Sequence, residues 1–371
     1  MKFIRNFSRL FVGLVFIFSG TVKGIDPLGT AYKIEDYFIA YGTEWAMPLA
    51  LFIAVSLCTL EFILGISLLF NASVKRTSWV LFPLMIFFTI LTLIDAVYEP
   101  VPDCGCFGDA IKLTNWETFY KNVVLIIFTA IIFFERKKFR PPAAYLYSFS
   151  VFTLFIICFV WFSNFNINHL PVVDFREWKV GNDMQPEGGG VAKIYLTYRN
   201  IATGEETEFL SEDLPWQDTV WMSEWEFVDQ RVDDSDVLKA HELIIESIDG
   251  EDQTEAFIGN PDYQFLLIAW NLEKTDADSF EKIKSLFSQA DRDGYSYIVI
   301  TSSLPEVTDL YREKYLLDEH LEFYFGDDIV LKTMIRSNPG LILMKDAVIL
   351  EKWHYNDFPE YSTIKDEYMK E

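Results

Sequence analysis

The stretch MPLALFIAVSLCTLEFILGISLLF, residues Met47–Phe70, decides the fold of the first half of the chain. Among its 24 residues, only Glu61 is ordinarily charged at neutral pH. A helix that crosses the hydrocarbon core of a bilayer needs about 20 mostly apolar residues. The stretch therefore predicts a membrane-spanning helix, and the lipid bilayer is the first partner that the sequence implies.

Four more apolar stretches flank this one, and the first of them is short enough to resemble a secretory signal. No small-x-small cleavage site follows it, so we expect a retained helix. The sequence thus predicts a bundle of five helices, with four in residues 1–140 and a fifth in residues 141–163. The four flanking stretches are Leu10–Gly24, Trp79–Tyr98, Phe119–Phe134 and Tyr145–Phe162.

The basic residues near the ends of these stretches predict the orientation of the protein. Nine Lys and Arg lie before the first stretch, between the second and third, and between the fourth and fifth, against four on the opposite side. Basic residues concentrate in cytoplasmic loops. We therefore expect a multi-pass protein of the cytoplasmic (inner) membrane with its N-terminus in the cytoplasm. The loops near residues 25–45 and 99–118, and everything after residue 163, are expected on the periplasmic side.

The distribution of charge divides the chain at the same point. Residues 1–163 hold 13 Lys and Arg and 11 Asp and Glu, whereas residues 164–371 hold 18 and 44. A change this sharp predicts at least two domains. The acidic half repels polyanions, so we expect no nucleic-acid partner. The sequence also has no zinc-type ligand spacing, so we expect no metal site.

The outer loop EPVPDCGCFGD, residues 99–109, carries Cys104 and Cys106 with one glycine between them. Cysteines at i and i+2 can meet the Cα separation of a disulfide, although so small a ring is strained. Strained, exposed disulfides tend to be labile or catalytic. No His or Lys is adjacent in sequence, so we expect Asp103 and Asp109 to raise the thiol pKa values. A passive structural bridge and two free thiols are the open alternatives.

Two acids lie within the apolar stretches. An ionisable group in hydrocarbon costs about 2.5–3.5 kcal/mol, so it usually faces the interior of the bundle and has a role. Glu61 lies in the middle of its stretch and predicts a proton relay, or a protonated acid hydrogen-bonded to a neighbouring helix. Asp95 lies near the outer end of its stretch. It is interpreted either as a binding residue or as an interfacial carboxylate. Lys23 is placed where it can approach Asp95.

Three strings of the chain together resemble the DoxX-like superfamily, and within it membrane proteins of the methylamine-utilisation MauE type. The resemblance covers roughly residues 5–135. The strings are FSRLFVGLVFIFSGTVKGIDPLG (Phe7–Gly29), TLEFILGISLLF (Thr59–Phe70) and DCGCFGD (Asp103–Asp109).

This resemblance implies a four-helix membrane core related to quinone-linked disulfide-forming proteins. It also implies a role in maturing exported, disulfide-containing partners, with quinone as a cofactor. Cys104 and Cys106 match the redox pair of the family, and Glu61 and Lys23 match its membrane-embedded polar positions.

The outer half predicts a β-rich segment, residues 164–255, followed by an α/β domain, residues 256–371. The β-rich segment contains a hairpin formed by Val191–Asn200 and Glu205–Leu210. The second part reads as strands and helices in the order βαβαβαββ. It resembles a thioredoxin-like fold, in which Pro339 is the cis-proline beside a peptide-binding site.

The α/β domain lacks the cysteines that a thioredoxin uses for chemistry. The position that follows the first strand reads WNLEKTD, residues 270–276. The resemblance therefore implies a domain that is not itself redox-active.

Two functions fit these observations. The first is a membrane thiol–disulfide oxidoreductase, in which Cys104 and Cys106 exchange with an exported partner, a membrane acceptor takes the electrons, and Glu61 handles protons. The second is a non-catalytic scaffold or assembly factor whose acidic outer domain binds an exported or membrane protein.

Overall fold

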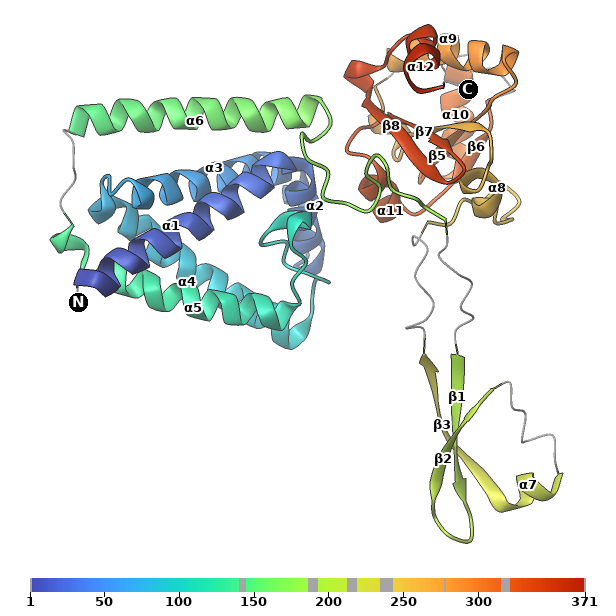
Figure 1. Ribbon diagram of the computed structural model, residues 1–371, viewed down its shortest axis with the longest axis horizontal. Helices are drawn as coiled ribbons and strands as arrows, with labels where there is room; N and C mark the ends of the chain where they lie inside the picture. The colour runs from blue at the N-terminus through green and yellow to red at the C-terminus, as the bar shows by residue number, and fades with distance from the viewer. Residues whose placement is uncertain are drawn as a thin grey trace.

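The structure, a computed structural model, describes residues 2–139, 145–185, 193–211, 219–233, 243–276, 278–314 and 321–369. A bundle of apolar helices is followed by a mixed α/β region with two sheets (Figure 1). Within these residues, four helices are long and apolar enough to cross a membrane. They are α1 (Lys2–Ile25), α3 (Ala50–Leu69, preceded by the 3₁₀ helix η1, Glu44–Leu49), α4 (Val74–Tyr98) and α5 (Asn115–Phe134).

Helices α1 and α3 approach each other through glycines. A Cβ atom on Gly20 of α1 would lie 2.6 Å from the backbone nitrogen of Phe62, and one on Gly65 of α3 would lie 2.7 Å from the backbone nitrogen of Ile17. Small residues let helix backbones come close within a membrane, where packing drives helix association. This close contact brings the polar side chains of α1 and α3 within reach of each other.

Helix α5 packs along α4 and begins with a capping box. The Thr114 hydroxyl accepts a hydrogen bond from the backbone N–H of Glu117, whose carboxylate accepts one from the backbone N–H of Thr114. Deeper in the pair, the Asn122 side-chain amide donates to the Thr92 hydroxyl, 3.1 Å away. These bonds fix where α5 starts after the cysteine loop.

The outer segment 25–45, expected as a loop, contains the helix α2 (Pro27–Ala40). Asp26 caps this helix by accepting a hydrogen bond from the backbone N–H of Gly29, 2.8 Å away, and Pro27 occupies the first turn. The sequence did not predict this helix, because its apolar residues are too few for a span. Its Ala31 packs on Ala50 and Ala54 of α3 instead.

The fifth apolar stretch forms the helix α6 (Tyr145–Asn168), which ends six residues later than Phe162. It lies alongside α1 and α3 (Figure 1). The ring of Phe159 stacks on Phe62 of α3 with centroids 4.4 Å apart, and Asn166 donates a hydrogen bond to the Gly24 carbonyl. That α6 crosses the membrane stays a prediction.

A five-stranded sheet forms the centre of the C-terminal domain, in the order β6-β5-β4-β7-β8. β5 runs parallel to β4 and β6, whereas β7 is antiparallel to both β4 and β8. The elements follow the expected order of strands and helices. Their bounds are β4 (Tyr263–Ile268), α9 (Ser279–Arg292), β5 (Ser296–Thr301), α10 (Pro305–Lys314), β6 (Phe323–Phe325), α11 (Asp328–Met334), β7 (Gly340–Lys345), β8 (Val348–His354) and α12 (Tyr361–Tyr368).

Helices cover both faces of this sheet. Alternate residues of β4 face opposite sides, so Phe265 packs against α9 and α12, whereas Leu266 packs against α11 and the short helix α8 (Thr254–Ile258). The segment that follows α6 joins the second face, where Trp178 and Met184 are buried.

The expected hairpin is present as β1 (Lys193–Asn200) paired with β2 (Glu206–Leu210); Val191 and Ala192 lie outside the described residues. The sequence did not predict α7 (Thr219–Glu224) or β3 (Trp225–Asp233), which pairs with β1. These strands form a separate sheet that projects away from the α/β domain (Figure 1).

Candidate functional site

Lys23 of α1 and Glu61 of α3 form an ion pair inside the helix bundle. The Lys23 Nζ atom lies 2.8 Å from Glu61 Oε1 and 3.0 Å from Oε2, and the two side chains are 7% and 4% exposed. The Ser19 hydroxyl lies 2.8 Å from Glu61 Oε2 and 2.9 Å from the carbonyl oxygen of Cys106, so it can donate its proton to either. The pair is therefore linked to the cysteine turn through Ser19.

Asp95 has a different partner from the one that we expected. The Tyr37 hydroxyl of α2 donates a hydrogen bond to Asp95 Oδ2 at 2.6 Å, and Asp95 is fully buried. The expectation that Lys23 approaches Asp95 was wrong, because the glycine contact between α1 and α3 directs Lys23 to Glu61. Asp95 Oδ1 has no hydrogen-bond partner among the described residues.

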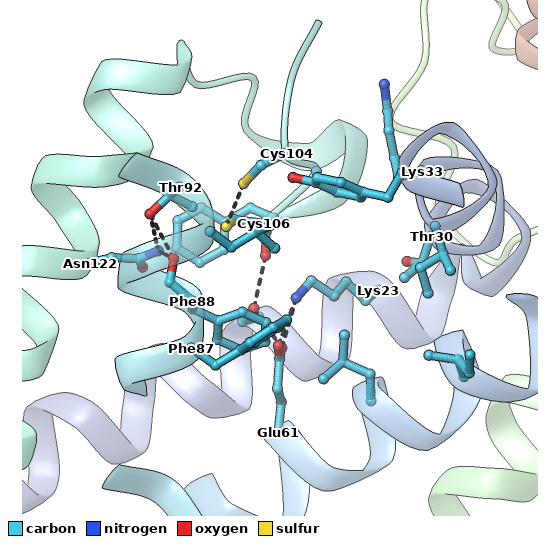
Figure 2. Close-up of a pocket in the computed structure, with 18 of the residues that line it drawn as sticks. Lys23, Thr30, Lys33, Glu61, Phe87, Phe88, Thr92, Cys104, Cys106 and Asn122 are labelled. Carbon is cyan, nitrogen blue, oxygen red and sulfur yellow. Dashed lines mark hydrogen bonds and ion pairs between the residues drawn. The ribbon is translucent and has the colours of Figure 1, made fainter. Parts of the chain in front are cut away.

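The two cysteine sulfur atoms meet in a tight turn between α4 and α5. Cys104 Sγ and Cys106 Sγ lie 2.8 Å apart as thiols. Gly105 has φ +60°, a conformation that glycine adopts at little cost, and its N–H donates to Asp103 Oδ1 at 2.9 Å. Figure 2 shows Cys106 between Cys104 and the pair formed by Lys23 and Glu61.

The surroundings of the turn stabilise one thiolate. The Cys104 thiol donates a hydrogen bond to Cys106, and this bond is the main reason why the pKa of Cys106 falls to about 6. Burial opposes this shift, and Lys121 and Lys23 favour it. The same bond, followed by burial, raises the pKa of Cys104, which keeps its proton. The turn therefore favours a thiolate at Cys106 and a proton at Cys104.

The expectation that nearby acids raise both thiol pKa values was wrong for Cys106. Asp103 forms an ion pair with Lys33 of α2 at 2.7 Å, and Asp109 forms one with Arg336 of the C-terminal domain at 3.1 Å. Basic groups from distant parts of the chain thus offset the acids of the turn, and adjacency in sequence did not reveal them.

An apolar cavity of about 510 Å³ opens beside the turn. The side chains of Lys23, Glu61 and Cys106 lie at its wall, together with Cys104 and Asn122 (Figure 2). Most of the remaining wall is aromatic or aliphatic and comes from α1, α2, α3, α4 and α5, including Phe16, Phe38, Ile53, Leu57, Phe88, Leu91 and Leu125. The cavity can hold a flat or elongated apolar molecule next to the two sulfur atoms.

Four residues of this site were missed from the sequence: Ser19, Lys33, Tyr37 and Lys121. Lys121 lies nearly two turns into α5, and its Nζ atom is 4.3 Å from the ring centroid of Phe107, which follows Cys106. Lys33 and Tyr37 lie one helical turn apart on α2, a spacing that would have marked them as neighbours had the helix been predicted.

Pro339 belongs to the C-terminal domain, and its peptide bond with Asn338 is cis. The proline is buried at the start of β7, and the Asn338 side chain donates a hydrogen bond to the carbonyl oxygen of Asn271 at 2.7 Å. The proline directly precedes β7 of the C-terminal sheet and does not line the cavity. A nearby residue, Arg336, reaches the membrane region.

These helices define a multi-pass membrane protein with four candidate spans and a mixed α/β region after them. Residues 1–135 match the family model described as "Methylamine utilisation protein MauE", so this part of the chain is a MauE-family membrane region. No curated protein and no solved structure matches the chain. The family match covers α1 to α5 and both cysteines of the turn.

Proposed function

We propose that this protein is a membrane thiol–disulfide oxidoreductase in which Cys104 and Cys106 form the redox pair. The observation that carries the proposal is the contact between the two sulfur atoms, 2.8 Å apart at the wall of an apolar cavity. Two sulfurs this close in a turn can bond with little movement, and the low pKa of Cys106 supplies a thiolate near neutral pH.

The proposed reaction transfers two electrons from an exported protein to the cysteine pair. A thiolate of the partner attacks Cys104 Sγ of the disulfide form, the bond between the cysteines breaks, and Cys106 leaves as a thiolate. A second partner thiolate attacks the partner sulfur of this mixed disulfide and releases Cys104. The partner gains a disulfide and loses two protons, while the pair is reduced. Cys106 suits the leaving role because a thiol of low pKa leaves faster.

The acceptor that we propose is a lipid-soluble quinone, because the wall of the cavity suits its chemistry. The wall offers aromatic rings such as Phe16 and Phe88 for a flat head group, and Lys23 as a donor toward a ring oxygen. A bound quinone supplies a sink for two electrons and two protons. Ser19 links Glu61, the partner of Lys23, to the carbonyl oxygen of Cys106, which supports a relay role for Glu61.

We also propose that residues 256–371 form a thioredoxin-like domain without redox cysteines. Two parallel strands followed by an antiparallel pair, and a cis proline before β7, support this assignment. In the proposed orientation the domain and the cysteine turn lie on the periplasmic side. Labelling of Cys104 and Cys106 by a membrane-impermeant maleimide in intact, reduced cells tests that orientation.

The redox function is tested with Cys104→Ser, Cys106→Ser and the double variant. Cys158→Ser is the matched control, because Cys158 is exposed on α6 away from the turn. We expect exported thiol proteins to accumulate in reduced form in each turn variant and not in the control, measured by alkylation and mass spectrometry of membranes and periplasm. An unchanged thiol pattern in the double variant would overturn the proposal.

The acceptor is tested separately on purified protein in lipid nanodiscs. Reduced protein is mixed with a short-chain ubiquinone, and the loss of free Cys104 and Cys106 thiols is followed with time. We expect oxidation in the wild type and at least a severalfold slower rate when Leu91→Trp fills the cavity. Equal rates in the two proteins would remove the quinone from the proposal and leave the thiol exchange in place.

A second candidate function is a non-catalytic assembly factor, favoured by the sheet of β1, β2 and β3. This sheet projects away from the α/β domain (Figure 1). Apolar side chains are exposed on it and on the elements beside it: Phe227 on β3, Ile201 after β1 and Met222 on α7. Crosslinking in cells with and without residues 193–233 tests it. A specific crosslinked protein that disappears with the deletion, while the cysteine variants have no effect, would favour this function over the first.

A further inference from the structure

Arg336, three residues before the cis proline, contacts the membrane region across the domain boundary. Its Nε atom donates to Asp26 Oδ2 at 2.9 Å, and Nη2 donates to Asp109 Oδ2 at 3.1 Å. The Arg336 side chain is only 5% exposed. Burial alone lowers the pKa of Arg336, but the carboxylates of Asp26 and Asp109 raise it above its ordinary value. The guanidinium is thus a buried cation held by two carboxylates from distant parts of the chain.

The rest of this contact comes from the same side of the α/β domain. Lys332 of α11 lies 4.9 Å from the ring centroids of both Tyr32 on α2 and Trp270 after β4. The rings of Tyr32 and Trp270 meet edge to face, with centroids 6.3 Å apart. The side of the domain that carries the cis peptide bond is therefore in contact with α2, a helix of the membrane region.

The two carboxylates bound by Arg336, those of Asp26 and Asp109, lie in different elements of the membrane region. Asp26 caps α2 through the N–H of Gly29, and a Cβ atom on Gly29 would lie 2.7 Å from Arg336 Nη2. Asp109 follows Cys106 by three residues, in the 3₁₀ helix η2 (Gly108–Ala110). One guanidinium thus joins the start of α2 to the end of the cysteine turn.

The other end of the turn is tied to the same helix. Asp103 precedes Cys104 and binds Lys33 of α2 at 2.7 Å. The turn therefore has two ionic anchors, Lys33 before the cysteines and Arg336 after them. The anchor at Lys33 belongs to the membrane region, whereas the one at Arg336 exists only when the α/β domain is in place.

We propose that Arg336 is a positioning residue: by binding Asp26 and Asp109 together, it fixes the turn that carries Cys104 and Cys106 when the α/β domain is docked. The domain then acts on the cysteines without supplying a reactive group of its own. This inference rests on the proposed redox function, since it names a control of that same site.

The test compares Arg336→Met with Asp109→Asn, which breaks the same contact from the membrane side. Hydrogen–deuterium exchange is measured on residues 103–110 of the full-length, reduced protein in nanodiscs. Loss of a charged hydrogen bond predicts about tenfold faster exchange of this segment in both variants. The matched control is Lys365→Met on α12, which removes a half-exposed ion pair with Asp293 at the end of α9 and should leave the segment unchanged.

A second measurement, the pH midpoint of Cys106 alkylation, separates a loss of turn positioning from a general increase in the mobility of the turn. Arg336→Met leaves the Asp109 carboxylate unpaired near Cys106, so the pH midpoint of Cys106 alkylation should rise by about one unit. Asp109→Asn removes that charge, so its midpoint should not rise. Near-UV circular dichroism shows whether each protein is folded; if Arg336→Met fails to fold, Asp109→Asn decides alone.

Unchanged exchange of residues 103–110 in folded variants would overturn the inference. Neither readout depends on a partner or an acceptor. If Cys104→Ser and Cys106→Ser leave exported thiols unaffected, the proposed redox function is overturned. The anchoring of the turn by Arg336 is still tested by these two measurements.

Discussion

The ammonium group of Lys23 and the carboxylate of Glu61 lie 2.8 Å apart, on two helices whose backbones touch through Gly20 and Gly65. Neither side chain is more than 7% exposed. The charge of each group in the bundle is therefore matched by the other, and the position of both depends on how closely α1 and α3 pack.

Removing one member of this pair is expected to destabilise the protein strongly. Lys23→Met and Glu61→Gln each leave a buried partner without its counter-charge, which typically costs about 3–5 kcal/mol. Thermal unfolding in detergent measures the loss. The double variant should recover much of it, because no uncompensated charge remains; a double variant less stable than both single variants would contradict this.

A larger residue at Gly20 should separate the two helices. The Cβ atom of Gly20→Val would lie 2.6 Å from the backbone nitrogen of Phe62, and overpacking of this kind costs about 1–3 kcal/mol. A lower unfolding temperature is expected. Leu14→Ala on the same helix is the control, since Leu14 is exposed and its loss should change stability little.

Cys104 and Cys106 should differ in how their rates of alkylation depend on pH. Alkylation requires the thiolate, whose fraction rises with pH through the pKa. Iodoacetamide modification of Cys106 in the reduced protein is expected to reach half its maximal rate near pH 6, against about 8.5 for an ordinary cysteine. Peptide mass spectrometry over a pH series measures both sites.

The variant Cys104→Ala should move that midpoint upward, because the hydrogen bond from Cys104 is the main cause of the low pKa of Cys106. Cys58→Ser, a buried site on α3, serves as the matched control. A wild-type midpoint already near 8.5 would show that the thiolate is not stabilised in the turn.

The contact between Tyr37 and Asp95 should stabilise the end of the bundle that packs against α2. Tyr37→Phe removes a hydrogen bond from a fully buried carboxylate, and such a loss costs about 1–3 kcal/mol. Asp95→Leu combined with Tyr37→Phe should be milder than Tyr37→Phe alone, because neither polar group is then buried without a partner. Chemical unfolding of the three proteins in detergent checks the order.

Much of this fold could be predicted from local patterns. The long apolar stretches, the capping box at Thr114 and the alternating elements of the C-terminal domain each have a short-range signal. The α2 helix and β3 escaped prediction because neither has a strong apolar period, and tertiary packing decides them.

The candidate site was predictable only in part, for a related reason. Cys104, Cys106 and Glu61 stand out by residue type, whereas their partners are set by distance in space. Lys23 pairs across 38 positions, Lys33 reaches Asp103 across 70, and Arg336 reaches Asp109 across 227. Charges brought together over such separations leave no signal in a single sequence.

The contact between Asp109 and Arg336 also has a consequence for biosynthesis. Ribosomes add about 5–20 residues per second, so the 227 positions that separate the two residues correspond to roughly 11–45 s of translation. The newly inserted helices must wait through this interval with the carboxylates of Asp26 and Asp109 unneutralised by Arg336. The contact between Asp109 and Arg336 therefore forms late in the synthesis of each chain. A polypeptide that terminates before residue 336 cannot form it.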